Sequence, residues 1–201
     1  SASKNKIDPD FEYLGMFAEE CFVPLCYGGG IKNERQAENI LKIGFEKISI
    51  NSAAVEDIKF VERLAQEFGS QSIVGSIDIK RNVFRTPSVF CPHVDRGLKV
   101  SSPVSFAKML TEAGLGELLI TSVDNEGLGV GYDLEIIKDI ARSVDVPVIA
   151  CGGADNLQHL ADAVEVGASA VAGGKMFVFH GKHRAVLISY PDEGELENTL
   201  P

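Results

Sequence analysis

One glycine-punctuated unit occurs twice in this sequence. The first copy, "CYGGGIKNERQAENILKIGFEKISIN", begins at Cys26, and the second, "CGGADNLQHLADAVEVGASAVAGG", begins at Cys151. In each copy a short apolar run leads into glycines, an asparagine follows as a helix N-cap, and a glycine closes the helical stretch. The asparagines are Asn33 and Asn156, and Gln36 is expected to complete a capping box with Asn33. A repeated unit of this kind favours a fold of alternating strands and helices.

The rest of the sequence keeps the same alternation of apolar runs and helix-period segments. The runs are near-continuously apolar, which is typical of strands buried on both faces of a parallel sheet. We expect a helix before the first run, a small hairpin at "NVFRTPSVF" in the polar stretch from Ile79 to Val100, and a final helix in the tail. The six predicted strands are Val23–Tyr27, Glu46–Asn51, Ser72–Asp78, Glu117–Asp124, Val146–Cys151 and Ala168–Gly174.

Two architectures accommodate such units. A doubly wound sheet predicts one glycine-rich loop at one switch point, whereas this sequence has two. A barrel built from two similar halves explains both copies, although a (βα)8 barrel usually needs eight units and ~250 residues. For these 201 residues we therefore expect one domain, 1–201, with the fold of a TIM-type (βα)8 barrel that lacks its first two strands and keeps six βα units. The motifs G-x-G-x-x-G and G-x-x-x-x-G-K-[ST] are absent from the sequence.

Composition narrows the classes of function. The net charge of −10 and the pI of about 4.9 argue against a broad nucleic-acid or anionic-membrane surface. No apolar run approaches the ~20 residues that span a bilayer, and the polar start is unlike a signal peptide, so we expect a cytoplasmic protein that does not insert into membranes. The four cysteines and four histidines show no metal-ligand spacing, and the cysteines are expected to be buried, reduced thiols.

The residues that follow the predicted strands are candidates for ligand binding, because parallel α/β folds bind ligands at the carboxyl ends of their strands. Gly30 precedes Asn51 by the same 21 residues that separate Gly153 from Gly174. Glycine lets an oxyanion approach the backbone, and N–H groups at a helix start can bind it. Two such anion grips, one in each half, would hold a ligand with a phosphate at both ends. The alternative is that these glycines only turn the chain from strand to helix.

Two carboxylates are candidates for chemistry at the same end of the sheet. Asp78 ends an apolar strand, where a carboxylate has no structural requirement and can act as a general acid or base. Its alternative role is an ion pair with Lys80 or Arg81. Asp124 has a similar position, but capping of the turn "DNEGLGVGYD" competes with a role in the active site.

Taken in order, "YGGGI", "KISINSAAVED", "FGSQSIVGSIDIKR", "GELLITSVDNEG", "GYDLEII" and "PVIACGGA" resemble the cyclase subunits of imidazole glycerol phosphate synthase, a family of histidine biosynthesis. The resemblance runs from Ser1 to about Phe179. It implies a (βα)8 barrel that takes ammonia from a partner glutaminase subunit. It also implies conversion of a bis-phosphorylated ribulosyl-formimino-carboxamide nucleotide into imidazole glycerol phosphate and an aminoimidazole carboxamide ribotide, with no metal and no organic cofactor. The two phosphates of that substrate match the two anion grips.

The resemblance assigns roles to individual residues. Asp78 corresponds to one of two catalytic aspartates, and Thr121 to an inward-facing strand residue of the active site. Lys47 and Glu117, at the amino ends of their strands, correspond to charged residues where ammonia enters, although charges at that face usually serve stability. The residues that correspond to the two phosphate sites are Gly30, Asn51, Ser52 and Gly127 for one, and Gly153, Gly174 and Lys175 for the other.

Three departures from the family's pattern bear on activity. The other catalytic aspartate belongs to a first strand that is not in these residues, and "SAS" at the start is expected to end the second strand, so we expect no cyclase turnover. The family's "DRDGT" turn is here "DNEGL", and Lys175 replaces a small hydroxyl residue. Absent strands would also leave the edges Val23–Tyr27 and Ala168–Gly174 open. We expect the chain either to self-associate there or to close these edges with a rearranged segment.

Three other functions remain open. The tail "MFVFHGKHRAVLISYP" resembles the branch of the family that accompanies acetamidino modification of surface-polysaccharide sugars, again with ammonia from a glutaminase. A non-catalytic barrel fragment that binds phosphates is a second alternative. A sister isomerase with the same half-barrel repeat is the third, although "SINSAAVED" and "GSIDIKR" favour the cyclase.

Overall fold

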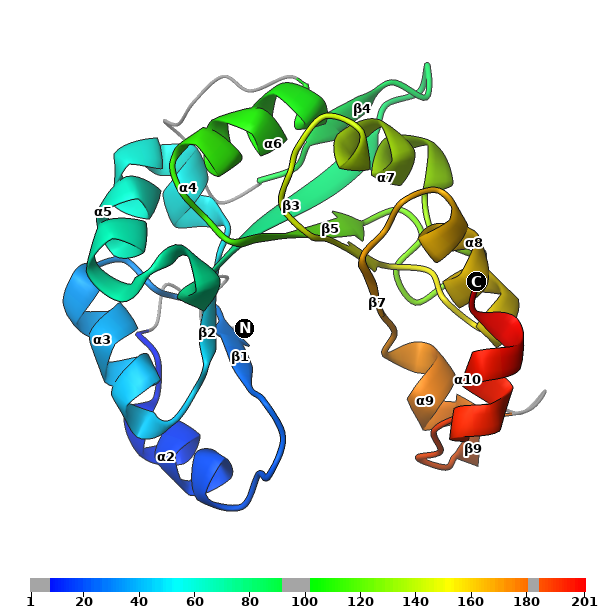
Figure 1. The fold of residues 1–201 in the computed structure, drawn as a ribbon, viewed down its shortest axis with the longest axis horizontal. Coiled ribbons are helices and arrows are strands. Elements are labelled where there is room, and N and C mark those ends of the chain that lie inside the picture. The colour runs from blue at the N-terminus through cyan, green and yellow to red at the C-terminus, as the bar shows by residue number, and fades with distance from the viewer. Residues whose placement is uncertain (1–7, 92–101, 181–184) are drawn as a thin grey trace.

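The computed structural model describes residues 8–91, 102–180 and 185–201. Its centre is a curved sheet whose parallel strands follow the order β1-β2-β3-β5-β6-β7, while β4 pairs antiparallel with β3 (Figure 1). A separate two-stranded hairpin, β8-β9, lies in the tail. The bounds are β1 Cys26–Gly28, β2 Lys47–Ile50, β3 Ile73–Arg81, β4 Pro87–Val89, β5 Glu117–Ser122, β6 Val148–Cys151, β7 Ala170–Ala172, β8 Phe179–His180 and β9 Ala185–Val186.

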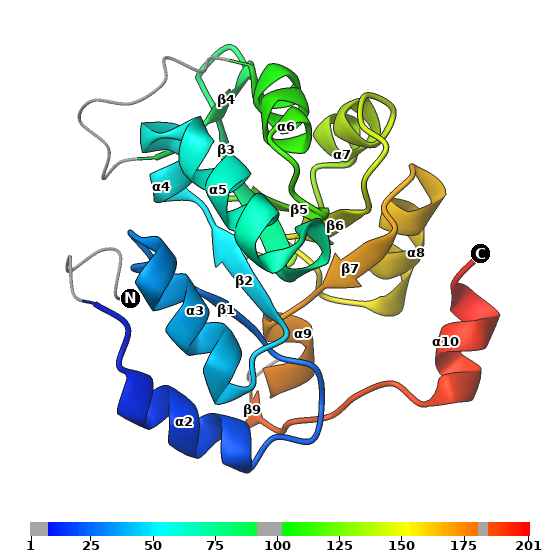
Figure 2. The same ribbon diagram turned by 60° about the vertical axis from the view of Figure 1, so that its left-hand side comes forward.

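Helices follow the strands and lie along the outer, convex side of the sheet (Figure 1). The helix before the first strand packs against α3, and the last helix lies beside α8 (Figure 2). The bounds are α2 Phe11–Glu19, α3 Glu34–Ile43, α4 Ser52–Glu56, α5 Ile58–Phe68, α6 Pro103–Glu112, α7 Leu134–Ala141, α8 Leu157–Glu165, α9 Lys175–Val178 and α10 Glu193–Thr199, with a 3-10 turn η1 at Ser70–Ser72.

Side chains alternate between the two faces of the sheet. In β5, Leu118 and Ile120 are buried and belong to the same apolar cluster as Phe106 and Ile136 of the neighbouring helices. The intervening side chains of β5 are half-buried and lie on the concave face. One face of each strand therefore forms the core with the helices, and the other face is available for a site.

The two copies of the glycine-punctuated unit fold alike. Asn33 and Asn156 cap α3 and α8, each accepting a hydrogen bond from the backbone N–H three residues on. Gly44 and Gly167 follow these helices with φ of 119° and 115°, a conformation that favours glycine. The capping box expected at Gln36 is wrong, because its Oε1 accepts from the N–H of Lys32, the residue before the cap, at 2.8 Å.

The structure confirms the parallel αβ alternation and the hairpin at β3–β4. The expected strand ends shift by a few residues, as strand ends commonly do. The expected final helix is present as α10, and the tail also contains α9 and the β8–β9 pair, which were not expected. Within the described residues β1 and β7 are the two ends of the strand order. Self-association through these edges stays a prediction, and the expected strand end at Ser1–Ser3 lies outside the described residues.

Candidate active site

Three side chains form one row across neighbouring strands at the carboxyl ends of the sheet. Asp78 of β3 pairs in register with Thr121 of β5, and Thr121 pairs with Cys151 of β6. Paired residues of adjacent strands point to the same face. Thr121 lies on the half-buried, concave face of β5, so the row lines that face. The structure thus brings a carboxylate, a hydroxyl and a thiol together.

Asp78 has the environment of a carboxylate that can hold a proton. Burial raises the pKa of its carboxyl above the usual value, and a hydrogen bond to the Asn51 side chain opposes this rise. The alternative role in an ion pair is wrong. Within the described parts of the chain Arg81 binds Asp133 instead, and the ammonium of Lys80 lies 5.2 Å from the centre of the Phe90 ring.

Cys151 and Tyr132 were not expected in the site. Burial raises the pKa of the Cys151 thiol, Glu126 adds to this rise, and a hydrogen bond with Thr121 opposes it. Burial also raises the pKa of Tyr132, with further contributions from Cys151 and Glu126, and its hydroxyl donates to the Ala172 carbonyl at 3.0 Å. The alternation of side chains along β6 could have indicated the face of Cys151, because Ile149, two residues earlier, lies on the same concave face.

The prediction that the cysteines are buried is wrong for all four, and most clearly for Cys26, which is exposed. Its strand, β1, has a partner on one side only within the described residues, so the concave face of β1 is less covered than that of β5. Cys21, Cys91 and Cys151 are partly exposed, and all four thiols are free.

The spacing of 21 residues within the pairs Gly30/Asn51 and Gly153/Gly174 follows from the register of the paired strands. Gly28 of β1 pairs with Ser49 of β2, so Gly30 and Asn51 each follow the pairing by two residues. Cys151 of β6 pairs with Ala172 of β7, and Gly153 and Gly174 follow in the same way. Parallel strands therefore place both members of each expected grip at the same end of the sheet.

The glycines of the grips are required for different reasons. A Cβ at Gly153 would lie 2.1 Å from the Gly131 carbonyl oxygen, and its φ is +107°, so packing and conformation both demand glycine. Gly30 and Gly127 have φ of 73° and 74°. At Gly174, whose φ is −110°, no described atom lies within 4 Å of a Cβ position. Neither conformation nor packing explains that glycine, and this leaves room for a ligand.

The remaining expected residues lie around this end of the sheet. Ser52 begins α4, and its hydroxyl lies 3.5 Å from the Cys91 sulfur. The Asp124 carboxylate accepts from the backbone N–H of Arg81 at 2.7 Å rather than capping its own turn. No group of three or more histidine, cysteine or acidic side chains suited to a metal ion occurs in the described residues.

A sequence comparison identifies the family. The model of the histidine biosynthesis protein family matches residues 1–184. The chain belongs to the histidine biosynthesis protein family. It is 49% identical over 197 residues, covering 98% of this chain and 78% of the relative, to a putative imidazole glycerol phosphate synthase subunit hisF2 of Pseudomonas aeruginosa. It is 38% identical over 183 residues, covering 89% and 71%, to the imidazole glycerol phosphate synthase subunit HisF of Thermobifida fusca.

One departure from the family's pattern, Lys175, is bound within the fold. Its ammonium forms an ion pair with Asp155 at 2.9 Å and lies 3.5 Å from the Leu128 carbonyl oxygen. A Cβ at Gly129 would lie 2.6 Å from the ammonium, so that glycine makes space for the lysine. Lys175 therefore links the loops that follow β5, β6 and β7.

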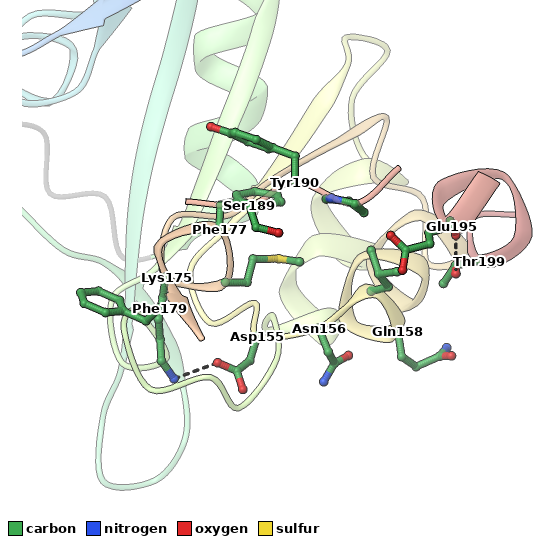
Figure 3. A pocket seen from close by; sticks show the side chains of 13 residues that line it. Asp155, Asn156, Gln158, Lys175, Phe177, Phe179, Ser189, Tyr190, Glu195 and Thr199 are labelled. Atoms are coloured by element: carbon green, nitrogen blue, oxygen red, sulfur yellow. Dashed lines mark hydrogen bonds and ion pairs between the residues drawn. The ribbon is translucent and has the colours of Figure 1, made fainter. Parts of the chain in front are cut away.

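Lys175 and Asp155 also border a cavity of about 930 Å³ between α8, α9 and the tail (Figure 3). Its other walls include Phe177 and Tyr190, whose rings stack with centroids 5.0 Å apart. The row that contains Asp78 does not line this cavity. The cavity is therefore separate from that row, but it shares Lys175 with the expected second phosphate site.

At the opposite end of the sheet Lys47 and Glu117 form an ion pair. They begin β2 and β5, and β3 lies between these strands. The side chains are 32% and 23% exposed, so the pair is largely covered. Two of the charged residues expected at the ammonia entrance thus form an ion pair that spans β3. No helix in the described parts of the chain is long and apolar enough to cross a membrane.

Proposed function

We propose that the chain acts as a cyclase-type subunit that binds a bis-phosphorylated ribulosyl-formimino-carboxamide nucleotide and uses ammonia from a glutaminase. The observation that carries this proposal is the position of Asp78 between two matched glycine pairs. One pair follows β1 and β2, the other follows β6 and β7, and β3 lies between them in the strand order. A substrate with a phosphate at each end would place its middle over Asp78.

In this proposal Asp78 is the general acid or base. Its pKa is raised by burial, which favours proton transfer closer to neutral pH than an exposed aspartate allows. Thr121, beside it in register, would contact the same part of the substrate. The glycine backbones together with Asn51 and Ser52 would hold the phosphates, and no metal ion or organic cofactor takes part.

Ammonia would enter at the other end of the sheet. Lys47 and Glu117 lie there, on the concave face that also carries Asp78 and Thr121 further along the strands. A glutaminase that docks at this end would release ammonia directly toward the row. The ion pair would then border the entrance rather than the reaction centre.

The resemblance divides acid–base work between two aspartates, of which these 201 residues supply Asp78. We therefore expect substrate binding by the 201 residues without turnover. Isothermal titration tests the binding, with the bis-phosphorylated nucleotide compared against an analogue that lacks one phosphate. We expect the bis-phosphorylated form to bind more tightly by roughly 100-fold, because its second phosphate is tethered close to its grip.

Equal affinities for the two ligands would contradict a pair of grips. Ammonia-dependent turnover that is lost in Asp78→Asn would contradict the expected inactivity but would support the role of Asp78. Binding of phosphate with no preference for the nucleotide would instead favour the non-catalytic phosphate-binding alternative.

A second candidate function rests on the resemblance of the tail to the acetamidino-modification branch. Identity to the putative subunits hisF2 of Pseudomonas aeruginosa and Campylobacter jejuni is 49% and 44%, against 38% for the subunit HisF of Thermobifida fusca. This pattern favours a specialised branch, for which we propose ammonia delivery in the acetamidino modification of surface-polysaccharide sugars. Complex formation with a glutaminase, together with no binding of the nucleotide, would favour this second function.

A further inference from the structure

The turn between β5 and α7, Asp124–Asp133, carries Gly127, and its three glycines give its backbone unusual conformational freedom. Gly127, Gly129 and Gly131 all have positive φ, at 74°, 75° and 89°. Three such glycines let the isolated turn adopt many conformations. Within the turn the Asn125 amide donates to the Gly131 carbonyl at 2.9 Å and the Leu128 N–H donates to the Asn125 carbonyl, so contacts from outside add to these restraints on Gly127.

Arg81, at the end of β3, binds both ends of this turn. Its backbone N–H donates to Asp124 Oδ2 at 2.7 Å. Its guanidinium donates from Nε and Nη2 to the two carboxylate oxygens of Asp133 at 2.6 and 2.8 Å. One residue thus spans the turn, with the backbone at the first residue and a bidentate side-chain pair at the last.

The same guanidinium contacts two further elements. Nη2 donates to Glu135 of α7 at 2.8 Å, and Nη1 donates to the Arg85 carbonyl in the β3–β4 hairpin at 2.6 Å. The side chains of Arg81 and Asp133 are 16% and 13% exposed. Because the pair is largely shielded from water, neither partner can be lost without leaving a poorly solvated charge.

We propose that Arg81 is a positioning residue that fixes the turn Asp124–Asp133 and thereby places the Gly127 backbone for anion binding. This inference rests on the proposed function for the role of Gly127, whereas the restraint of the turn stands on the contacts of Arg81 alone. Asp78 lies three residues before Arg81 on the same strand. The carboxylate of the site and the anchor of its grip are therefore fixed by one rigid element.

A purely structural role is the competing explanation, and Arg63 provides a matched control. Arg63 also binds an aspartate that caps a helix, Asp57 of α5, at 3.4 Å, and it binds Glu34 at 2.7 Å. It lies in the helical layer and contacts no residue of the turn through these bonds. Arg81→Gln and Arg63→Gln therefore remove the same kind of side chain from different surroundings.

The first measurement is amide hydrogen exchange in the full 201-residue chain. The informative amides are those of Glu126, Leu128 and Gly131, which donate to Ser122, Asn125 and Gly153. We expect Arg81→Gln to speed their exchange by about tenfold or more relative to amides of α3, because a charge-assisted bidentate contact is lost. Arg63→Gln should leave these three rates unchanged. Unchanged rates in Arg81→Gln would overturn the restraint.

The second measurement is a titration with inorganic phosphate, followed through the amide signals of Gly127 and Gly153. Arg81→Gln should weaken the response at Gly127 by about fivefold or more, with a smaller loss at Gly153, whose carbonyl accepts from Gly131 of the same turn. Arg63→Gln should leave both responses within about twofold, because its contacts with Glu34 and Asp57 lie outside the turn. Arg81→Lys keeps the charge but not the fork and should restore part of the affinity. Faster exchange with unchanged phosphate affinity would overturn the positioning role. A wild-type chain that gives no response at Gly127 would contradict the proposed grip, while the exchange data would still decide the restraint.

If the Arg81→Gln chain does not fold, Asp133→Asn tests the same ion pair from its other partner. Asparagine caps helices as well as aspartate does, so this change keeps the cap of α7 and removes the ion pair. Asp57→Asn makes the matching change at α5. We expect faster exchange in the turn for Asp133→Asn only. Equal behaviour of the two variants would contradict the proposal.

Discussion

Thr121 lies beside Asp78 in the register of β5 and β3, and it hydrogen-bonds with Cys151 on its other side. The Thr121 hydroxyl therefore lies between a half-buried carboxylate and a half-buried thiol. Both acidic groups have raised pKa values, with burial as the largest cause. The strand ends thus place two groups with raised pKa values on either side of Thr121, on a face that is open to a ligand. This arrangement suits proton transfer better than it suits stability.

Asp78→Asn should stabilise the fold at neutral pH. Burial raises the pKa of Asp78 in the folded chain above its unfolded value, so the wild-type carboxyl favours the folded state below the unfolded pKa and loses that contribution as the pH rises through the folded pKa. The neutral amide has no such loss. Urea unfolding between pH 3 and pH 8 should show a stability gain for the variant that grows with pH. As a control, Asp145→Asn changes an exposed aspartate before β6 and should have little effect at any pH. A gain for Asp78→Asn that shrinks as the pH rises would contradict the buried carboxylate.

The local features of this fold could be predicted from the sequence. Asn33, Asn156, Gly44 and Gly167 act within one helical turn, so their roles depend on neighbouring residues only. The 21-residue spacing also translated directly into structure, because parallel strands joined by similar helices keep similar registers. The tail was harder, since its short α9 is followed by the β8–β9 hairpin, whose pairing has no periodic signal.

The contacts that organise the candidate site could not be predicted in this way. Arg81 binds Asp133 across 52 residues of sequence, and Lys175 binds Asp155 from the next loop. Each pair depends on how loops from different strands meet, and many other charges could have paired as well. The position of Cys151 beside Thr121 follows from strand alternation, but only once the register is known.

Gly153→Ala and Gly174→Ala should separate packing from ligand binding. A Cβ at Gly153 would lie 2.1 Å from the Gly131 carbonyl oxygen in a residue with φ of +107°, so we expect a loss of about 2 kcal/mol or more in the free energy of unfolding. At Gly174 no described atom lies within 4 Å of the added methyl group, and we expect stability to stay within ~0.5 kcal/mol. Phosphate affinity should nevertheless fall in Gly174→Ala. A stable Gly174→Ala chain with unchanged phosphate affinity would remove this residue from the grip.

The ion pair of Lys47 and Glu117 should be measurable in a double-mutant cycle. Both side chains are largely covered, so removing one partner leaves the other poorly solvated. We expect Lys47→Met and Glu117→Gln each to lower stability, and the double variant to lose less than their sum, with a coupling energy of about 1 kcal/mol. Phosphate binding should not change, since the pair begins its strands while the grips follow the ends of theirs. A coupling energy near zero would contradict a formed pair, and altered phosphate binding would contradict the separation of the two ends.

Asp155→Asn and Lys175→Met should decide whether Lys175 adds charge to the second grip. The ammonium is held by Asp155 at 2.9 Å in the ligand-free chain, so the carboxylate competes with any anion for it. Removing that carboxylate should strengthen phosphate binding by about fivefold, in line with ~1 kcal/mol for a charge pair near 4 Å in water-like surroundings. Lys175→Met should weaken binding by a similar factor and reduce its dependence on salt. The measurement is phosphate titration at two ionic strengths, with Lys42→Met as the control because Lys42 is an exposed lysine paired with Glu38 on α3. If Lys175→Met binds phosphate as well as or better than the wild type, the lysine only links the loops and narrows the grip.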